Sequence, residues 1–302
     1  MISPVLDFHH TSPLAPYYAS NKDISLALTN SFRRFKKIST LGLNSSFPSD
    51  ILDSLYAFGY WASSIPLVDQ SVINSFSSRI SYQSVDFALN TFMHDLSYDE
   101  FLGSYKHIFS LPHLLDSINF YLGNDGLILY EASHFLQRRC FSTEKLPTSS
   151  YWHRDPVGSH IKIFLCLHNS PLGPSTGFVP YPFFDPVPRE WEMIRANKDS
   201  PLLLTLTKKI SNFKPLDFHQ AIGSILVIDT NCIHRGSYQL SDPSTNLSNF
   251  DYRHLLQFSF MNESQYSLYN RISGPLNPAP KTVVPRHSFP QLTLSSPPFS
   301  FS

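Results

Sequence analysis

Residues 151–160, YWHRDPVGSH, contain the residue types of a metal site, with His153 and Asp155 separated by one position. In an extended strand alternate side chains share a face, so His153 and Asp155 would project together and Arg154 would project away. An imidazole and a carboxylate can supply two ligands of a non-haem iron site, which also needs a second histidine. The triplet His-Arg-Asp also opens the catalytic loop of protein kinases. That interpretation fails, because His160 stands where a kinase has asparagine and the chain has no glycine-rich phosphate loop.

A candidate for the second histidine lies about 80 residues further along the chain. The β-type run SILVID (224–229) leads through a turn-like Thr-Asn pair to His234, which is followed by Arg235 and a glycine. Arg253 then enters another β-type run. The order is therefore His-x-Asp, a long interval, a strand that leads to a histidine, and an arginine on the next strand.

Hydrophobic periodicity divides the chain into a helical first part and a β-rich second part. Helices are expected at 23–38, 48–63, 84–96, 99–109, 111–123 and 189–198, and strands at 126–140, 161–168, 202–207, 221–229 and 251–260. The last 30 residues are rich in Pro and Ser, which predicts a tail or a surface strap. The expected class is α+β with a mainly β core.

Composition limits the possible partners. Lys plus Arg and Asp plus Glu each number 23 in 302 residues, so no net charge would draw the protein onto nucleic acid or an anionic membrane. No apolar stretch approaches the roughly 20 residues needed to span a bilayer. The first residues lack the basic region and apolar run of a signal peptide, and the three cysteines form no C-x-x-C, so a reducing, cytoplasmic environment is expected.

The arrangement of these residues resembles the phytanoyl-CoA dioxygenase-like family of iron(II)- and 2-oxoglutarate-dependent oxygenases. The resemblance covers roughly residues 126–262 and depends on His153-x-Asp155, on the segment from Gly223 to Gly236 with His234, and on the strand that Arg253 enters. The segment GPSTGFVPYP (173–182) also resembles the family's stretch between its metal-bearing strands. The interval from His234 to Arg253 is longer than is usual in the family, and the extra residues are expected to form a polar loop.

The resemblance implies a double-stranded β-helix, a jelly-roll or cupin-like barrel, with flanking helices. It implies that His153, Asp155 and His234 bind iron(II), and that Arg253 pairs with the far carboxylate of 2-oxoglutarate. With O₂ as the second cosubstrate, the expected reaction is hydroxylation of an unactivated C–H bond in a small-molecule or lipid-like substrate. The expected organisation is a helical part at 1–125, an oxygenase core at 126–265 and a tail at 266–302, all in one cooperative unit.

Several alternatives remain open at this stage. Arg235 competes with Arg253 as the cosubstrate anchor, but adjacent residues on a strand face opposite ways, which favours Arg253. Gln137 could also touch the cosubstrate, and it cannot share a strand face with His134, three positions before it. Cys232 could be a soft metal ligand, although buried cysteines are common. The same His/Asp/His set could serve a zinc hydrolase, or the barrel could be a non-catalytic binding protein.

Histidines outside this set have weaker patterns. The pair at 94–95 falls in an expected helix and fits a solvated face, and His160, His168 and His219 are expected to be structural.

Overall fold

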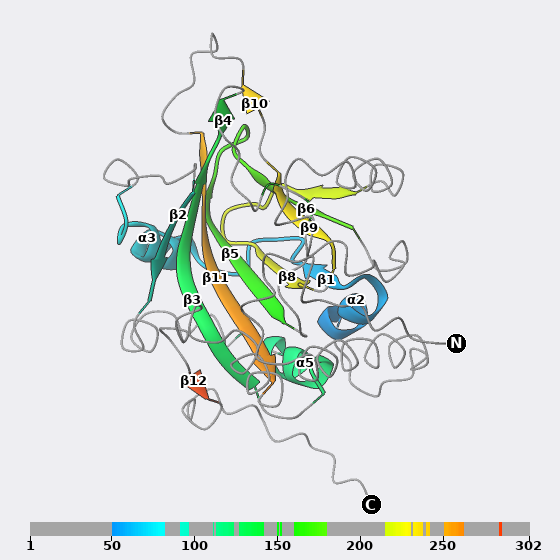
Figure 1. The fold of residues 1–302 in the computed structure, drawn as a ribbon. Coiled ribbons are helices and arrows are strands. Elements are labelled where there is room, and N and C mark those ends of the chain that lie inside the picture. Colours follow the sequence, from blue (N-terminus) through cyan, green and yellow to red (C-terminus); the bar gives the residue numbers. More distant parts are fainter. Residues whose placement is uncertain are drawn as a thin grey trace, which may run out of the picture.

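The computed structural model describes residues 50–81, 91–96, 111, 113–123, 127–141, 150, 152, 160–179, 215–230, 232–237, 240–241, 251–262 and 284–285. Within these residues the fold is mostly antiparallel β structure with few helices (Figure 1). The helices are α2 (Asp50–Phe58), α3 (Gln70–Ser77) and α5 (Leu114–Tyr121). The strands are β1 (Tyr60–Ala62), β2 (Thr91–Asp95), β3 (Leu127–Arg138), β4 (Cys140–Phe141), β5 (Ile161–Asn169), β6 (Ser175–Phe178), β7 (Leu216–Phe218), β8 (Ile225–Asp229), β9 (His234–Ser237), β10 (Leu240–Ser241), β11 (Tyr252–Asn262) and β12 (Val284–Pro285).

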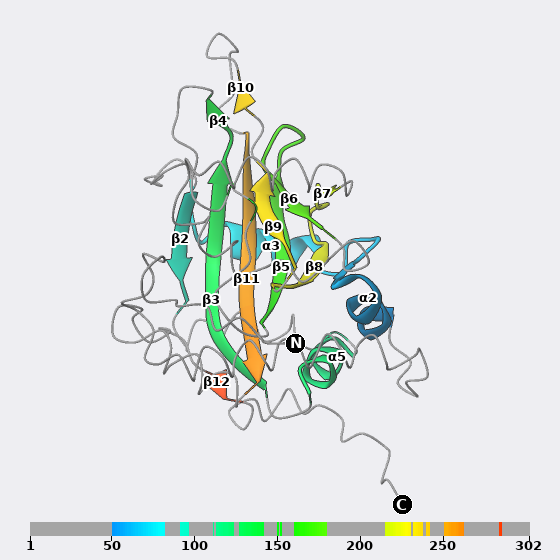
Figure 2. The ribbon, with the colours of Figure 1, turned by 45° about the vertical axis from the view of Figure 1, so that its right-hand side comes forward.

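Two sheets dominate this part of the chain. The larger has seven strands in the order β1-β8-β5-β11-β3-β12, with β2 also paired to β3, and the smaller has the order β7-β6-β9. Every pairing in these two sheets is antiparallel, and β4 and β10 form a separate parallel pair. The long strands β3 and β11 run side by side along the length of the molecule in both ribbon views (Figure 2).

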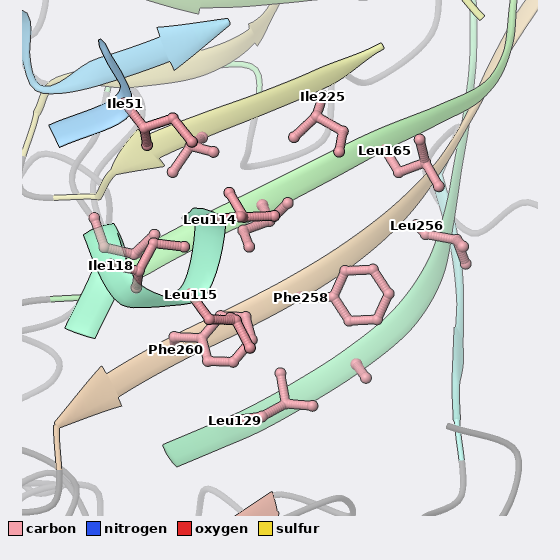
Figure 3. Packing of buried hydrophobic residues seen from close by; sticks show 14 of the residues in the cluster. Ile51, Leu114, Leu115, Ile118, Leu129, Leu165, Ile225, Leu256, Phe258 and Phe260 are labelled. Atoms are coloured by element: carbon pink, nitrogen blue, oxygen red, sulfur yellow. The ribbon is translucent and has the colours of Figure 1, made fainter. Parts of the chain in front are cut away.

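The main hydrophobic core lies between the larger sheet and the helices. Alternate residues of β11, namely Leu256, Phe258 and Phe260, pack with helix residues such as Leu115 and Ile118 (Figure 3). All five side chains are at most 6% exposed. Because successive strand residues point to opposite faces, the odd-numbered residues of β11 from Arg253 to Ser259 face away from the helices.

A second, smaller cluster lies between the two sheets. Phe164 of β5, Leu226 and Ile228 of β8 and Leu255 of β11 pack with Phe178 of β6. These contacts show that the smaller sheet covers the inner face of the larger one.

The structure agrees with the expected strands at 126–140, 161–168, 221–229 and 251–260 and with a helix inside 111–123. It corrects the N-terminal part, which also contributes strands to the core. The helix expected at 48–63 ends at Phe58, because Gly59 has φ 76° and redirects the chain into β1.

The helix expected at 84–96 is wrong for Thr91–Asp95, which form β2 and pair with β3. Cross-strand pairing overrides the local helical pattern there. Helix α3 was not expected. The elements expected at 23–38, 99–109, 189–198 and 202–207, and nearly all of the tail, lie outside the described residues. Among the described helices, none has the length and apolar character needed to cross a bilayer.

Candidate active site

His234 is the first residue of β9 and is 7% exposed. Its Nδ1 lies 2.9 Å from the carbonyl oxygen of Cys232. Since a carbonyl oxygen only accepts hydrogen bonds, Nδ1 carries the proton, and the lone pair of the neutral ring is on Nε2. Metal-binding histidines are oriented by this kind of hydrogen bond from the ring nitrogen that does not bind the metal. The buried, oriented ring fits the role of an iron ligand.

Cys232 contributes its backbone rather than its thiol to this arrangement. Its side chain is fully buried in the cluster between the sheets and forms no disulfide with another described cysteine. The sequence left this thiol open as a possible metal ligand. Its apolar surroundings are typical of a structural cysteine.

His153 and Asp155 lie outside the described residues. Within the described part of the chain, no group of three or more His, Cys, Asp or Glu side chains could hold a metal ion. Trp152, which directly precedes His153, is described and is 4% exposed. The guanidinium carbon of Arg235, which directly follows His234, lies 4.3 Å from the centre of the Trp152 ring. This is a cation–π contact between the neighbours of two candidate ligands.

Arg235 is held on the face of the smaller sheet that points away from the larger sheet. It pairs with Gly177 of β6, and a Cβ atom at position 177 would lie only 3.0 Å from Arg235 Cγ and 3.1 Å from Asp217 Oδ1. Glycine therefore leaves the space in which the arginine side chain lies. Burial lowers the pKa of Arg235, and the nearby Asp217 carboxylate acts in the opposite direction.

Arg253 lies on the inner face of β11 and is 2% exposed. Its Nε donates to Gln137 Oε1 at 3.0 Å, its Nη2 donates to the same oxygen, and its Nη1 donates to Thr176 Oγ1 at 2.8 Å. The guanidinium thus joins β3 and β11 of the larger sheet to β6 of the smaller one. Both of these acceptors are neutral, and they fix the orientation of the guanidinium.

Gln137 and His134 lie on opposite faces of β3, as their spacing predicts. Gln137 faces inward and contacts Arg253, whereas His134 faces the helices and its Nδ1 lies 2.9 Å from Nε2 of His254. Burial, followed by nearby positive charge, lowers the pKa of both histidines to about 3. This pair is therefore neutral near pH 7 and lies outside the candidate site.

The other histidines are found in varied settings. His94 is exposed on β2, and His219 is exposed after β7. His160 supplies a carbonyl to Thr230, and the His168 ring stacks on Tyr252 with centroids 4.2 Å apart.

Thr176 was not among the predicted site residues, although it lies in the segment GPSTGFVPYP that resembles the family. The sequence signal that could have found it is a threonine between two small residues, Ser175 and Gly177. The structure brings together Gln137, Thr176 and Arg253 from three strands, and it sets Arg235 apart on another face.

Comparisons with known proteins gave matches at the level of structure alone. No protein-family model matches the chain, and no curated protein matches its sequence. Among solved structures, HygX from Streptomyces hygroscopicus with nickel and 2-oxoglutarate bound is 15% identical, with a TM-score of 0.47, covering 72% of this chain and 88% of that one. EctD from S. alaskensis in its apoform is 11% identical, with a TM-score of 0.48, covering 74% and 80%. The α-ketoglutarate-dependent epimerase SnoN from nogalamycin biosynthesis is 13% identical, with a TM-score of 0.45, covering 70% and 79%. Similarity at this level assigns no activity.

Proposed function

We propose that this chain is an iron(II)- and 2-oxoglutarate-dependent oxygenase that hydroxylates an unactivated C–H bond of a small molecule. The observation that carries the proposal is the buried Arg253 guanidinium, fixed between the two sheets by Gln137 and Thr176. Burying a charged side chain is costly unless its surroundings hydrogen-bond it, and the planar fork of an arginine suits a carboxylate. A dicarboxylate cosubstrate gives this residue a function.

The iron site would consist of His153, Asp155 and His234. The contact between Trp152 and Arg235 supports this set, because Trp152 is bonded to His153 and Arg235 is bonded to His234. Two neutral imidazoles and one carboxylate on one face of iron(II) leave positions open for cosubstrates. The hydrogen bond from His234 to the Cys232 carbonyl keeps that ring in the tautomer that a metal requires.

The iron, 2-oxoglutarate and O₂ together would supply the oxidation of the substrate, with release of succinate and carbon dioxide. The protein's residues would bind, orient and exclude water. Arg253 would hold the far carboxylate, and Gln137 and Thr176 would hold Arg253. Phe178, Leu255 and their neighbours would keep water out of the space between the sheets.

The strand order supports a double-stranded β-helix for the core at 126–265. The chain passes from β5 in the larger sheet to β6 and β7 in the smaller one, returns to β8, crosses to β9 and comes back to β11. Such repeated crossing between two facing antiparallel sheets is typical of jelly rolls.

The test is an anaerobic titration of iron(II) into the apoprotein with 2-oxoglutarate, followed by the visible charge-transfer band of the chelate. We expect a band in the wild type and in His219→Ala, whose histidine is exposed away from the site, and no band in His234→Ala. Bound zinc without 2-oxoglutarate binding would instead indicate the hydrolase alternative, in which a buried guanidinium has no clear role. Absence of both metal and cosubstrate binding would indicate a non-catalytic protein.

A further inference from the structure

Four polar side chains line the inner face of β3 and β11 beyond Arg253. They are Glu131, Ser133, Gln257 and Ser259, and we refer to them as the polar strip. Their strand neighbours, such as Phe258, belong to the core beneath the helices, so the polar strip faces the space between the sheets. In register, Ser133 pairs with Gln257 and Glu131 pairs with Ser259, which makes two adjacent rows.

Ser133, Gln257 and Ser259 of the polar strip are buried and Glu131 is half-buried, yet the hydrogen-bonding groups of the strip are incompletely used. Ser259 Oγ donates to Glu131 Oε2 at 2.7 Å. Ser133 is 0% exposed, and its hydroxyl has no hydrogen-bond partner among the described residues. Gln257 is 6% exposed. Lys162 of β5 pairs with Ser259, so it lies in the same row as Glu131 and Ser259. Buried polar groups are normally hydrogen-bonded, so an unpaired hydroxyl here points to a ligand.

The polar strip belongs to one half of the space between the sheets. The other half, formed by β5 and β8, presents Phe164 and Leu226, which pack with Phe178 of β6. Tyr60 of β1 contacts the rings of Phe178 and Phe218, which places β6 and β7 over the β1 and β8 side. The order β7-β6-β9 then places β9, which begins at the candidate iron ligand His234, toward β11 and β3 (Figure 2). The polar strip therefore lies in the half toward which β9 is placed, beside the apolar Leu255.

Spacing along β11 separates the polar strip from the cosubstrate anchor. Alternate residues of a strand are about 7 Å apart, so Gln257 lies roughly 14 Å along the strand from Arg253, and Ser259 roughly 20 Å. A cosubstrate held by Arg253 would occupy the near end of this face. The far end of the face, at Gln257 and Ser259, would lie beyond the carboxylate that Arg253 holds.

We infer that the polar strip binds the oxidised substrate, and that this substrate is a small polar molecule with hydroxyl or ammonium donors rather than an acyl chain. The inference rests on the proposed function. Glu131 is the principal acceptor for such donors, because its carboxylate can receive charge-assisted hydrogen bonds. Ser133 and Gln257 add groups that both donate and accept, whereas a pocket for an acyl chain would be lined predominantly by apolar side chains.

The experiment uses the full chain loaded anaerobically with iron(II) and 2-oxoglutarate. The probes are the methanol–water fraction and the lipid fraction of one cell extract, and the retained compounds are identified by mass spectrometry after ultrafiltration. The variants are Glu131→Gln, which keeps the shape and removes the charge, and Ser133→Ala. Asp53→Asn, at an exposed position of α2, is the matched control.

We expect wild type and Asp53→Asn to retain one or a few compounds of the polar fraction. Retention should fall by about tenfold or more in Glu131→Gln, with amines affected more than neutral alcohols, while the chelate band persists. Three results would each overturn the inference. The protein could retain lipids, it could retain polar compounds to the same extent in the wild type and in both variants, or it could retain nothing while its chelate band is normal. If the wild type forms no chelate band, the proposed function fails and the inference fails with it.

Discussion

Replacing Arg253 by lysine tests the central contact of the proposed site. The contacts of the arginine include three hydrogen bonds to Gln137 and Thr176 on different strands, and it is 2% exposed. A guanidinium carries five N–H donors in a planar fork, whereas an ammonium carries three donors on one nitrogen. The ammonium of Arg253→Lys therefore cannot keep contact with both Gln137 and Thr176 while also binding a carboxylate in two places.

The expected magnitude follows from the loss of one hydrogen bond between charged groups. Such a bond contributes about 1.5–3 kcal/mol, and each 1.4 kcal/mol is a factor of ten in affinity. The dissociation constant for 2-oxoglutarate should therefore rise by roughly 10- to 150-fold in Arg253→Lys. Iron(II) binding in the absence of 2-oxoglutarate should change little, because Arg253 is not a proposed metal ligand.

The assay is an anaerobic titration of 2-oxoglutarate into the iron-loaded protein, with the charge-transfer band as the signal. Arg235→Lys is the matched control, because Arg235 lies against Trp152 on another face of the smaller sheet. The control should bind 2-oxoglutarate within about threefold of the wild type. If Arg253→Lys binds normally and Arg235→Lys does not, the anchor is Arg235 and the assignment is refuted.

Three further predictions follow from single contacts. Thr176→Val keeps the side-chain shape but removes the acceptor for Arg253 Nη1. The affinity for 2-oxoglutarate should therefore fall about tenfold in the same titration. An unchanged affinity would contradict a positioning role for Thr176. Gly177→Ala places a Cβ 3.0 Å from Arg235 Cγ, so the unfolding free energy in urea should fall by about 1–3 kcal/mol; unchanged stability would show that the arginine moves aside freely. The pKa of His134 and of His254 is about 3 in the fold, against about 6.5 when unfolded, so the unfolded chain binds more protons between these values. The unfolding free energy should therefore be highest above pH 6.5 and should fall as the pH drops toward 3. The slope should reach about 1.4 kcal/mol per pH unit for each histidine. Urea unfolding measures this, and an unfolding free energy that is constant between pH 7 and 5 would contradict the neutrality of the pair.

The inferred substrate, a small polar molecule, is narrower than the small-molecule or lipid-like substrate that the family resemblance implied. The alternation of β3 and β11 places apolar residues such as Phe258 beneath the helices and places Glu131 and Ser133 toward the space between the sheets. The alternation of these strands therefore decides which residues face the candidate site.

Local patterns in the sequence were sufficient to predict the main strands and the order of the candidate site residues. The alternation that separates His134 from Gln137 is a property of any extended strand, so the sequence alone could assign them to opposite faces. The bond from His234 to the Cys232 carbonyl joins residues two positions apart and depends on the turn that precedes β9. These features have short-range causes.

The remaining features depend on residues that are distant in the chain. Gln137 and Arg253 are 116 positions apart and Thr176 and Arg253 are 77 apart, and only strand register brings these three together. Pairing with β3 also made a strand of residues 91–95, against their local helical pattern. The sequence by itself determined which residues could do the chemistry. The tertiary structure decided which of them share a face, because the sheet register depends on the packing of the whole core and not on neighbouring residues.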